Sequence, residues 1–132
     1  MNTPDTPLRI CLASPEFAPL AKTGGLADVS AALSLYLHRA GHDVRVLIPR
    51  YARIDELGLE IEPVKGLVSM HASFGGTDLQ YGIDRTILPG SDLPVYLLSE
   101  KGREPTVAID PGSSILGRLE IPASYTQLTS AL

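Results

Sequence analysis

Hydrophobic and polar positions in the first fifty residues predict a strand, a helix and a second strand. The apolar run 8–13 contains a single charge, which is typical of a central parallel strand covered on both faces. From residue 26 the apolar spacing becomes three and four, as in a helix with one apolar face: Leu26, Val29, Leu33, Leu37 and Ala40. Gly41 ends this helix, and the β-branched run 43–48 predicts the second strand. The order is that of a right-handed βαβ unit.

The next segments predict a hairpin and one more strand. Residues 67–74 and 79–88 flank Gly75-Gly76-Thr77-Asp78, which favours an antiparallel hairpin added to the sheet as an ornament. Residues 94–98 predict a third parallel strand. Beyond residue 99 no helical period is found and only 115–121 is strand-like, so we expect a poorly ordered tail. The expected class is α/β, a partial Rossmann-like parallel sheet with an inserted β-hairpin.

The long connection 14–25 contains the strongest candidate site. Lys22-Thr23-Gly24-Gly25 lies between the first strand and the first helical turn, at the end of the sheet where open α/β folds bind ligands. Two glycines permit positive φ and close approach of a ligand, and the N–H groups of a helix start attract anions. Thr23 either caps the helix or donates to a phosphate, and Lys22 adds a full charge. The alternative is a simple turn beside a solvated lysine.

Two common nucleotide sites do not fit this loop. The pattern is neither Gly-x-Gly-x-x-Gly nor a loop ending in Gly-Lys-Ser or Gly-Lys-Thr. The second strand is followed by Pro49-Arg50-Tyr51, where a ribose-binding acidic residue is needed for NAD. The sequence therefore argues against both NAD binding and ATP hydrolysis.

Composition narrows the remaining classes. The 132 residues are 44% hydrophobic and 20% charged with a net charge of -4, which indicates one globular domain and argues against nucleic acid as a partner. The lone Cys11 is expected to be buried in its strand, and no apolar run is long enough for a membrane span. With a polar start to the chain, these features favour the cytoplasm. His38 and His42 are separated by the helix-ending Gly41, so no metal site and no cofactor are expected.

Residues 13–29, the turn Gly41-His42-Asp43-Val44 and the segment Pro49-Arg50-Tyr51 together resemble the start of bacterial glycogen synthases and plant starch synthases. The resemblance implies a retaining GT-B glycosyltransferase that moves glucose from ADP-glucose to the non-reducing end of an α-1,4-glucan. It also implies that Lys22, Thr23, Gly24 and Gly25 contact the nucleotide sugar.

Two acidic residues lie on either side of the loop 22–25. By the same resemblance, Glu16 matches an acidic residue on the acceptor side of the cleft, and the alternative is a solvated loop carboxylate. Asp28 falls in the first helical turn, where a carboxylate favours the helix dipole, so a structural role is preferred for it.

The chain departs from that family after residue 98, where the expected elements and the second lobe are missing. We therefore expect residues 1–100 to form a partial catalytic domain and 101–132 to form a divergent tail, with no catalytic residue present and no transfer by the chain alone. The implied partners are ADP-glucose, an α-1,4-glucan and possibly a separate C-terminal lobe. The alternatives are a noncatalytic module that binds a sugar phosphate or glucan, and a nonfunctional truncated remnant. An uncovered apolar face and sheet edge would promote pairing or aggregation.

Overall fold

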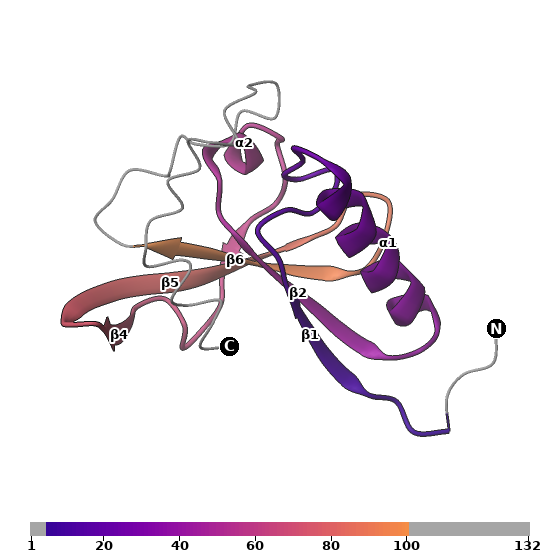
Figure 1. Cartoon of the computed structure of the whole chain (residues 1–132), viewed down its shortest axis with the longest axis horizontal. Helices are drawn as coiled ribbons and strands as arrows, with labels where there is room; N and C mark the ends of the chain where they lie inside the picture. The colour runs from indigo at the N-terminus through magenta and orange to yellow at the C-terminus, as the bar shows by residue number, and fades with distance from the viewer. Residues whose placement is uncertain (1–4, 101–132) are drawn as a thin grey trace.

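The computed structural model describes residues 5–100, apart from the side chain of Phe74 (Figure 1). Two helices and six strands follow one another in the order β1 (Arg9–Ala13), α1 (Gly25–Arg39), β2 (Asp43–Pro49), α2 (Ala52–Asp55), β3 (Glu62–Pro63), β4 (Met70–Phe74), β5 (Thr77–Ile87) and β6 (Pro94–Glu100). The expected βαβ unit is present, and α2 and β3 are additional short elements that the sequence pattern did not predict.

All six strands belong to one mixed sheet with the order β1-β2-β6-β5-β3, and β4 pairs with β5. The β1, β2 and β6 strands are parallel, with Cys11 opposite Arg45 and Ile48 opposite Leu97. The α/β class and the third parallel strand are therefore confirmed. From β5 onward the pairing is antiparallel.

The first strand differs from its prediction. Among residues 5–100, β1 pairs only with β2, so it lies at an edge of the sheet instead of the centre. Its burial alternates, with Ile10 and Leu12 packed on the core and Arg9, Cys11 and Ala13 exposed. The expectation of a strand covered on both faces was wrong, and so was that of a buried Cys11, because α1 covers only one face of β1 and the thiol points to the other.

The hairpin is confirmed, but it is not an ornament. Its turn is tighter than predicted, because Gly75 and Gly76 alone connect the strands with φ of 55° and 80°. Two successive positive φ values define the type I′ turn that matches the twist of paired strands. β5 then pairs with β6 from Tyr81 opposite Glu100 to Ile87 opposite Pro94, which makes the hairpin an integral part of the sheet.

The core lies between the sheet and the two helices. Its large, fully buried side chains come from the centre of the sheet, from the loop after β1, from α2 and from the loop before β6: Val44, Val46, Ile48, Val95, Leu97, Phe17, Leu20, Ile54 and Leu93. Close packing of β-branched and leucine side chains here explains why β2 and β6 carry the apolar runs seen in the sequence.

The helix α1 contacts the sheet through a different face from the one its apolar spacing suggests. The buried positions are the small residues Ala27, Ser30, Ala31 and Ser34, whereas Leu26, Val29 and Leu33 are exposed. Of the predicted apolar stripe, Leu37 packs partly against the core. Small side chains let the helix approach the strands closely, and Leu26, Val29 and Leu33 are left on the outer side.

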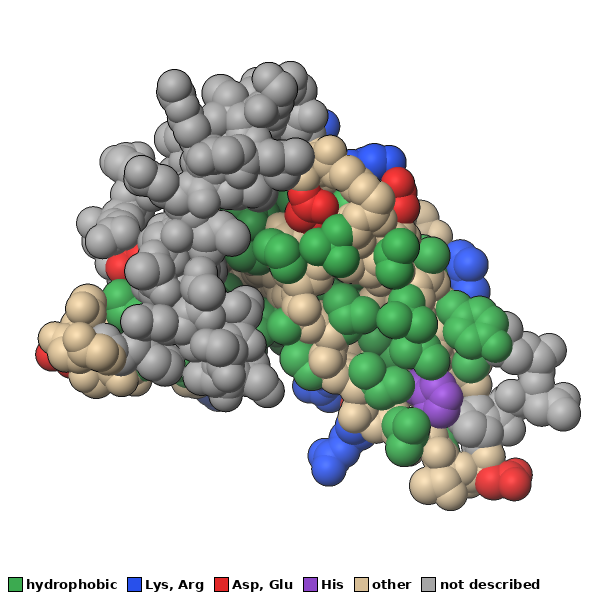
Figure 2. Space-filling view, viewed as in Figure 1, with side chains coloured by type: hydrophobic (Ala, Val, Ile, Leu, Met, Phe, Trp, Pro, Cys, Tyr) green, Lys and Arg blue, Asp and Glu red, His purple; other side chains and the backbone are tan. Residues whose placement is uncertain are grey.

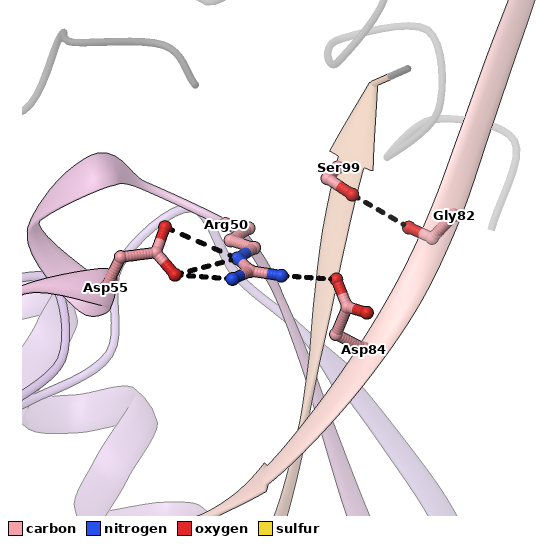
Figure 3. Close-up of polar contacts among 5 residues, drawn as sticks. All are labelled: Arg50, Asp55, Gly82, Asp84 and Ser99. Atoms are coloured by element: carbon pink, nitrogen blue, oxygen red, sulfur yellow. Dashed lines mark hydrogen bonds and ion pairs between the residues drawn. The ribbon is translucent and has the colours of Figure 1, made fainter. Parts of the chain in front are cut away.

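A charged cluster joins the end of β2 to β5 (Figure 3). The Arg50 guanidinium donates from Nη1 to Asp84 over 2.7 Å and from Nε to Asp55 over 3.1 Å, and Nη2 also contacts Asp55. These two carboxylates, Asp55 first, raise the pKa of Arg50 above its usual value. Nearby, Ser99 Oγ donates to the Gly82 carbonyl over 3.5 Å. The parallel and antiparallel parts of the sheet are thus tied by side chains as well as by backbone.

The predicted tail 101–132, with its strand-like segment 115–121, lies outside the described residues. Within 5–100, neither helix has the length and hydropathy needed to cross a bilayer.

Candidate functional site

The loop between β1 and α1 is anchored along its length. Ser14 N donates to the Leu47 carbonyl over 3.1 Å, and the Tyr51 hydroxyl donates to the Pro15 carbonyl over 2.8 Å. Phe17 and Ala21 exchange two backbone hydrogen bonds of 2.8 Å. With Phe17 and Leu20 fully buried, the loop is fixed to the core, so the segment that follows it starts from a defined position.

Two serines that the sequence did not single out tie this loop to the helix. Ser14 Oγ donates to the Glu16 carbonyl over 2.7 Å and lies 3.1 Å from Ser30 Oγ in α1. Both serines are buried, where hydroxyls need partners. The available sequence signal was Ser30 itself, a polar residue in line with Ala27 and Ala31 on the small-residue face of the helix.

The predicted lysine stands at the start of α1. Lys22 Nζ lies 2.8 Å from both carboxylate oxygens of Asp28, and the two side chains are 51% and 56% exposed. Asp28 lies in the first turn of α1, so its expected structural position is confirmed. The pair holds the ammonium group over the N-terminal turn while leaving it accessible to solvent.

The glycine pair does not have the backbone conformation that was expected. Gly24 is the N-cap of α1 with φ of -165°, an extended conformation open to any residue, and neither Gly24 nor Gly25 has positive φ. A Cβ atom added to either glycine would meet nothing within 4 Å. No described part of the chain requires glycine here, and the space in front of both residues is open.

Thr23 does not cap the helix. Gly24 is the N-cap, and no side chain caps the backbone N–H groups at the start of α1, so this alternative for Thr23 was wrong. Its other suggested role, as a donor to phosphate, stays a prediction. The N–H groups at the helix start are consequently not occupied by a side-chain oxygen. Uncapped N–H groups and the positive end of the helix dipole are the components of an anion site.

Glu16 lies deeper than a solvated loop residue. It is only 7% exposed, and its backbone N–H is 3.3 Å from Ser14 Oγ. Burial of the residue as a whole does not decide between the acceptor-side role and a loop carboxylate in contact with solvent, so both stay predictions. No hydrogen bond or ion pair of its side chain to another residue of 5–100 is found. A carboxylate with this burial beside an open loop is a good acceptor for hydroxyl groups.

Both histidines near the end of α1 have local partners. His38 Nε2 lies 2.6 Å from Asp92, and His42 Nδ1 accepts from the Leu8 N–H over 3.1 Å. Asp92 has a lowered pKa, first because His38 hydrogen-bonds to its carboxylate. Residues 5–100 contain no group of three metal-ligating side chains.

Comparison with known protein families places these features in context. The model of the starch synthase catalytic domain matches residues 9–106. Glycogen synthase 1 of Geobacter metallireducens is 43% identical over 96 residues, which are 72% of this chain and 19% of that protein. Glycogen synthase of Moorella thermoacetica is 44% identical over 93 residues, or 70% of this chain and 18% of its own.

A solved structure has a similar fold over the matched part of the chain. The catalytic domain of starch synthase IV from Arabidopsis thaliana, bound to ADP and acarbose, superimposes with a TM-score of 0.63 at 29% identity. The match covers 73% of this chain and 19% of that one. The chain thus spans about a fifth of the length of these relatives.

Proposed function

The chain belongs to the starch synthase catalytic domain family, and on that premise we propose that residues 22–25 bind the diphosphate of ADP-glucose in a glucosyltransferase that extends an α-1,4-glucan. The observation that carries the proposal is the open space at Gly24 and Gly25 in front of an uncapped helix start. Glycine at a position where the chain itself tolerates a Cβ is explained if a ligand occupies that space. The Arabidopsis relative supports it, since its structure was solved with ADP.

The chemistry requires positive potential where the leaving group departs. When the bond between glucose C1 and the distal phosphate oxygen breaks, the electron pair stays on ADP and its negative charge increases. Backbone N–H groups at the start of α1 and the Lys22 ammonium stabilise that charge without rearrangement, because the loop behind them is fixed by buried Phe17 and Leu20. The glucosyl group passes to the 4-hydroxyl oxygen at the non-reducing end of the glucan, and the hydroxyl proton leaves with the ADP.

We place Glu16 on the acceptor side of this cleft. Glu16 is 7% exposed and lies three residues after the end of β1, in the connection that leads to residues 22–25. A carboxylate accepts hydrogen bonds from sugar hydroxyls, so its proposed role is to orient the acceptor.

The proposed contribution of this chain is one side of the cleft. A transferase of this kind encloses its substrates to exclude water and align the reacting atoms. Because the chain spans about a fifth of its relatives, we expect it to bind the donor without transferring glucose when it is assayed alone.

Calorimetric titration of the full chain with ADP-glucose tests the site. Lys22→Ala removes a charge-assisted contact of about 1.5–3 kcal/mol, so we expect roughly 10- to 100-fold weaker binding. Lys65→Ala is the matched control, because Lys65 is an exposed lysine outside the loop. Equal affinities for the two variants would refute the phosphate role of Lys22.

Two further results would favour other functions. Binding of a maltooligosaccharide that is independent of Lys22, without binding of ADP-glucose, would indicate a noncatalytic glucan-binding module. A folded chain that binds neither ligand would indicate a nonfunctional remnant.

A further inference from the structure

The buried side of α1 contains two hydroxyl groups. Ser30 and Ser34, about one turn apart, are both buried against the rest of the molecule. The outer side of the helix carries large apolar residues instead, and Figure 2 shows hydrophobic side chains gathered over this part of the surface. A helix that packs on a sheet normally has the opposite distribution of polarity. Each buried hydroxyl group therefore needs an explanation.

The two serines differ in their hydrogen bonds. Within the described part of the chain, Ser34 Oγ has no partner, whereas Ser30 Oγ lies 3.1 Å from Ser14 Oγ. Ser14 Oγ donates its only proton to the Glu16 carbonyl over 2.7 Å, so the proton between the two serines comes from Ser30. Ser14 Oγ also accepts from the Glu16 N–H over 3.3 Å. Ser30 is thus the first donor of a short chain of hydrogen bonds that ends on the backbone of Glu16.

The residues on both sides of Glu16 are held as well. The Pro15 carbonyl accepts from the Tyr51 hydroxyl over 2.8 Å. Phe17 exchanges two backbone hydrogen bonds of 2.8 Å with Ala21. The side chain of Glu16 is the exception, because this residue is 7% exposed and its carboxylate has no hydrogen bond or ion pair within the described part of the chain. A fixed backbone around an unpaired carboxylate is typical of a side chain that is preorganised for a ligand.

We infer that Ser30 is a positioning residue, which acts through Ser14 to orient the Glu16 carboxylate toward the hydroxyl groups of a glucan acceptor. The inference rests on the acceptor half of the proposed function. In that site α1 contributes to both substrates, because its first N–H groups face the donor and Ser30 orients the acceptor residue. One helix then fixes the separation between donor and acceptor, and transfer between two bound molecules requires such alignment.

Titration of the full chain with a maltooligosaccharide and, separately, with ADP-glucose tests the inference. Ser30→Ala removes the first donor of the chain of hydrogen bonds. Ser34→Ala is the matched control, because it deletes a buried hydroxyl group of the same helix that has no described partner. Ser30→Ala should weaken maltooligosaccharide binding by about 2- to 10-fold and leave ADP-glucose binding unchanged. Ser34→Ala should change neither affinity.

Two further variants separate positioning from a general loss of structure. In a Glu16→Gln background, Ser30→Ala should weaken maltooligosaccharide binding by less than about 2-fold, because the carboxylate that Ser30 orients is already replaced. Tyr51→Phe keeps the aromatic ring and releases the Pro15 carbonyl, so it should also weaken binding of the oligosaccharide alone. This variant tests the fixed backbone even if Ser30→Ala does not fold.

Four results would overturn the inference. One is an unsubstituted chain that binds no maltooligosaccharide, and another is equal affinity of Ser30→Ala and Ser34→Ala for it. The third is a parallel loss of ADP-glucose binding in Ser30→Ala or Tyr51→Phe, as a disrupted loop would cause. The fourth is additive losses from Ser30→Ala and Glu16→Gln. Failure of the proposed donor site is distinguishable, because a chain that binds the oligosaccharide through Ser30 but does not bind ADP-glucose refutes only the donor role of residues 22–25.

Discussion

The two sides of the sheet differ in how completely they are enclosed. On the antiparallel side, β5 lies between β6 and the two strands β3 and β4, and Asp84 of β5 is held by Arg50. On the parallel side, β1 has a single strand partner within residues 5–100, and α1 exposes Leu26, Val29, Leu33 and Tyr36. The candidate donor loop belongs to this less enclosed side.

The residues that stabilise the fold of this chain are different from those of the candidate site. The buried side chains that hold the described residues together concentrate in β2, β6 and the loop after β1. The open space at Gly24 and the exposed Lys22 make no comparable contribution to packing. Substitutions on the two sides should therefore change different measurements.

The largest expected effect comes from comparing two leucines. Leu97 in β6 is fully buried, so Leu97→Ala should lower the free energy of unfolding by about 2–5 kcal/mol, through lost burial and a cavity. Leu33 in α1 is 46% exposed, and Leu33→Ala should change it by less than about 0.5 kcal/mol. Denaturant unfolding of the full chain measures both.

Similar losses from the two leucine variants would contradict the comparison. That outcome would mean that the outer face of α1 is already covered in the isolated chain.

The same contrast explains what the sequence revealed and what it did not. The spacing of apolar residues and the β-branched runs predicted the order of β1, α1, β2 and β6. They also predicted that the three strands are parallel, because order and direction depend on local preference and short connections. The Gly75-Gly76 turn predicted the hairpin, since two positive φ values strongly favour glycine. Local rules were sufficient for these elements.

Burial on the parallel side was not predictable in the same way. The spacing of Leu26, Val29 and Leu33 correctly indicated a helix, but only tertiary contacts decide which face meets the sheet. Cys11 was assigned to the interior on the assumption that both faces of β1 are covered, whereas the face that carries the thiol is exposed. Chemical predictions for Lys22 and Glu16 depended on resemblance, because their residue types and spacing alone also fit an ordinary loop.

The second largest effect concerns the link between the two sides. Arg50→Ala leaves the carboxylate of Asp84, which is 14% exposed, without its guanidinium partner. We expect a loss of about 1–3 kcal/mol in the free energy of unfolding. Arg45→Ala is the control, because Arg45 is 57% exposed and its contact with Asp43 is 3.4 Å, so a smaller loss than that of Arg50→Ala is expected.

If the Arg50→Ala and Arg45→Ala variants unfold at the same denaturant concentration, the ion pairs of Arg50 do not stabilise the contact between the two parts of the sheet.

Two glycines sharpen the distinction between stability and binding. Gly76 has φ of 80° in the hairpin turn, so Gly76→Ala should cost about 1–2 kcal/mol of stability. Gly24 has φ of -165° and open space at its Cβ position, so Gly24→Ala should change stability by less than about 0.5 kcal/mol. Under the proposed function, Gly24→Ala instead weakens binding of ADP-glucose, while Gly76→Ala does not. A Gly24→Ala variant with unchanged affinity would show that no ligand approaches this backbone.

The smallest effect is a pH dependence where α1 meets the loop between β5 and β6. His38 hydrogen-bonds to Asp92 over 2.6 Å and lowers the pKa of that carboxyl in the folded chain. A lowered folded-state pKa adds stability above the unfolded value of about 3.9, and this addition disappears as the pH falls through the folded-state pKa. The thermal midpoint of the full chain should therefore exceed that of Asp92→Asn at pH 6, and the two should converge below about pH 4.

Since Asp92 is 91% exposed, the difference should be smaller than that of any destabilising substitution above, and added salt should reduce it further. A difference that grows toward acid pH has the opposite sign and would show that the ionised Asp92 carboxylate does not stabilise the folded chain.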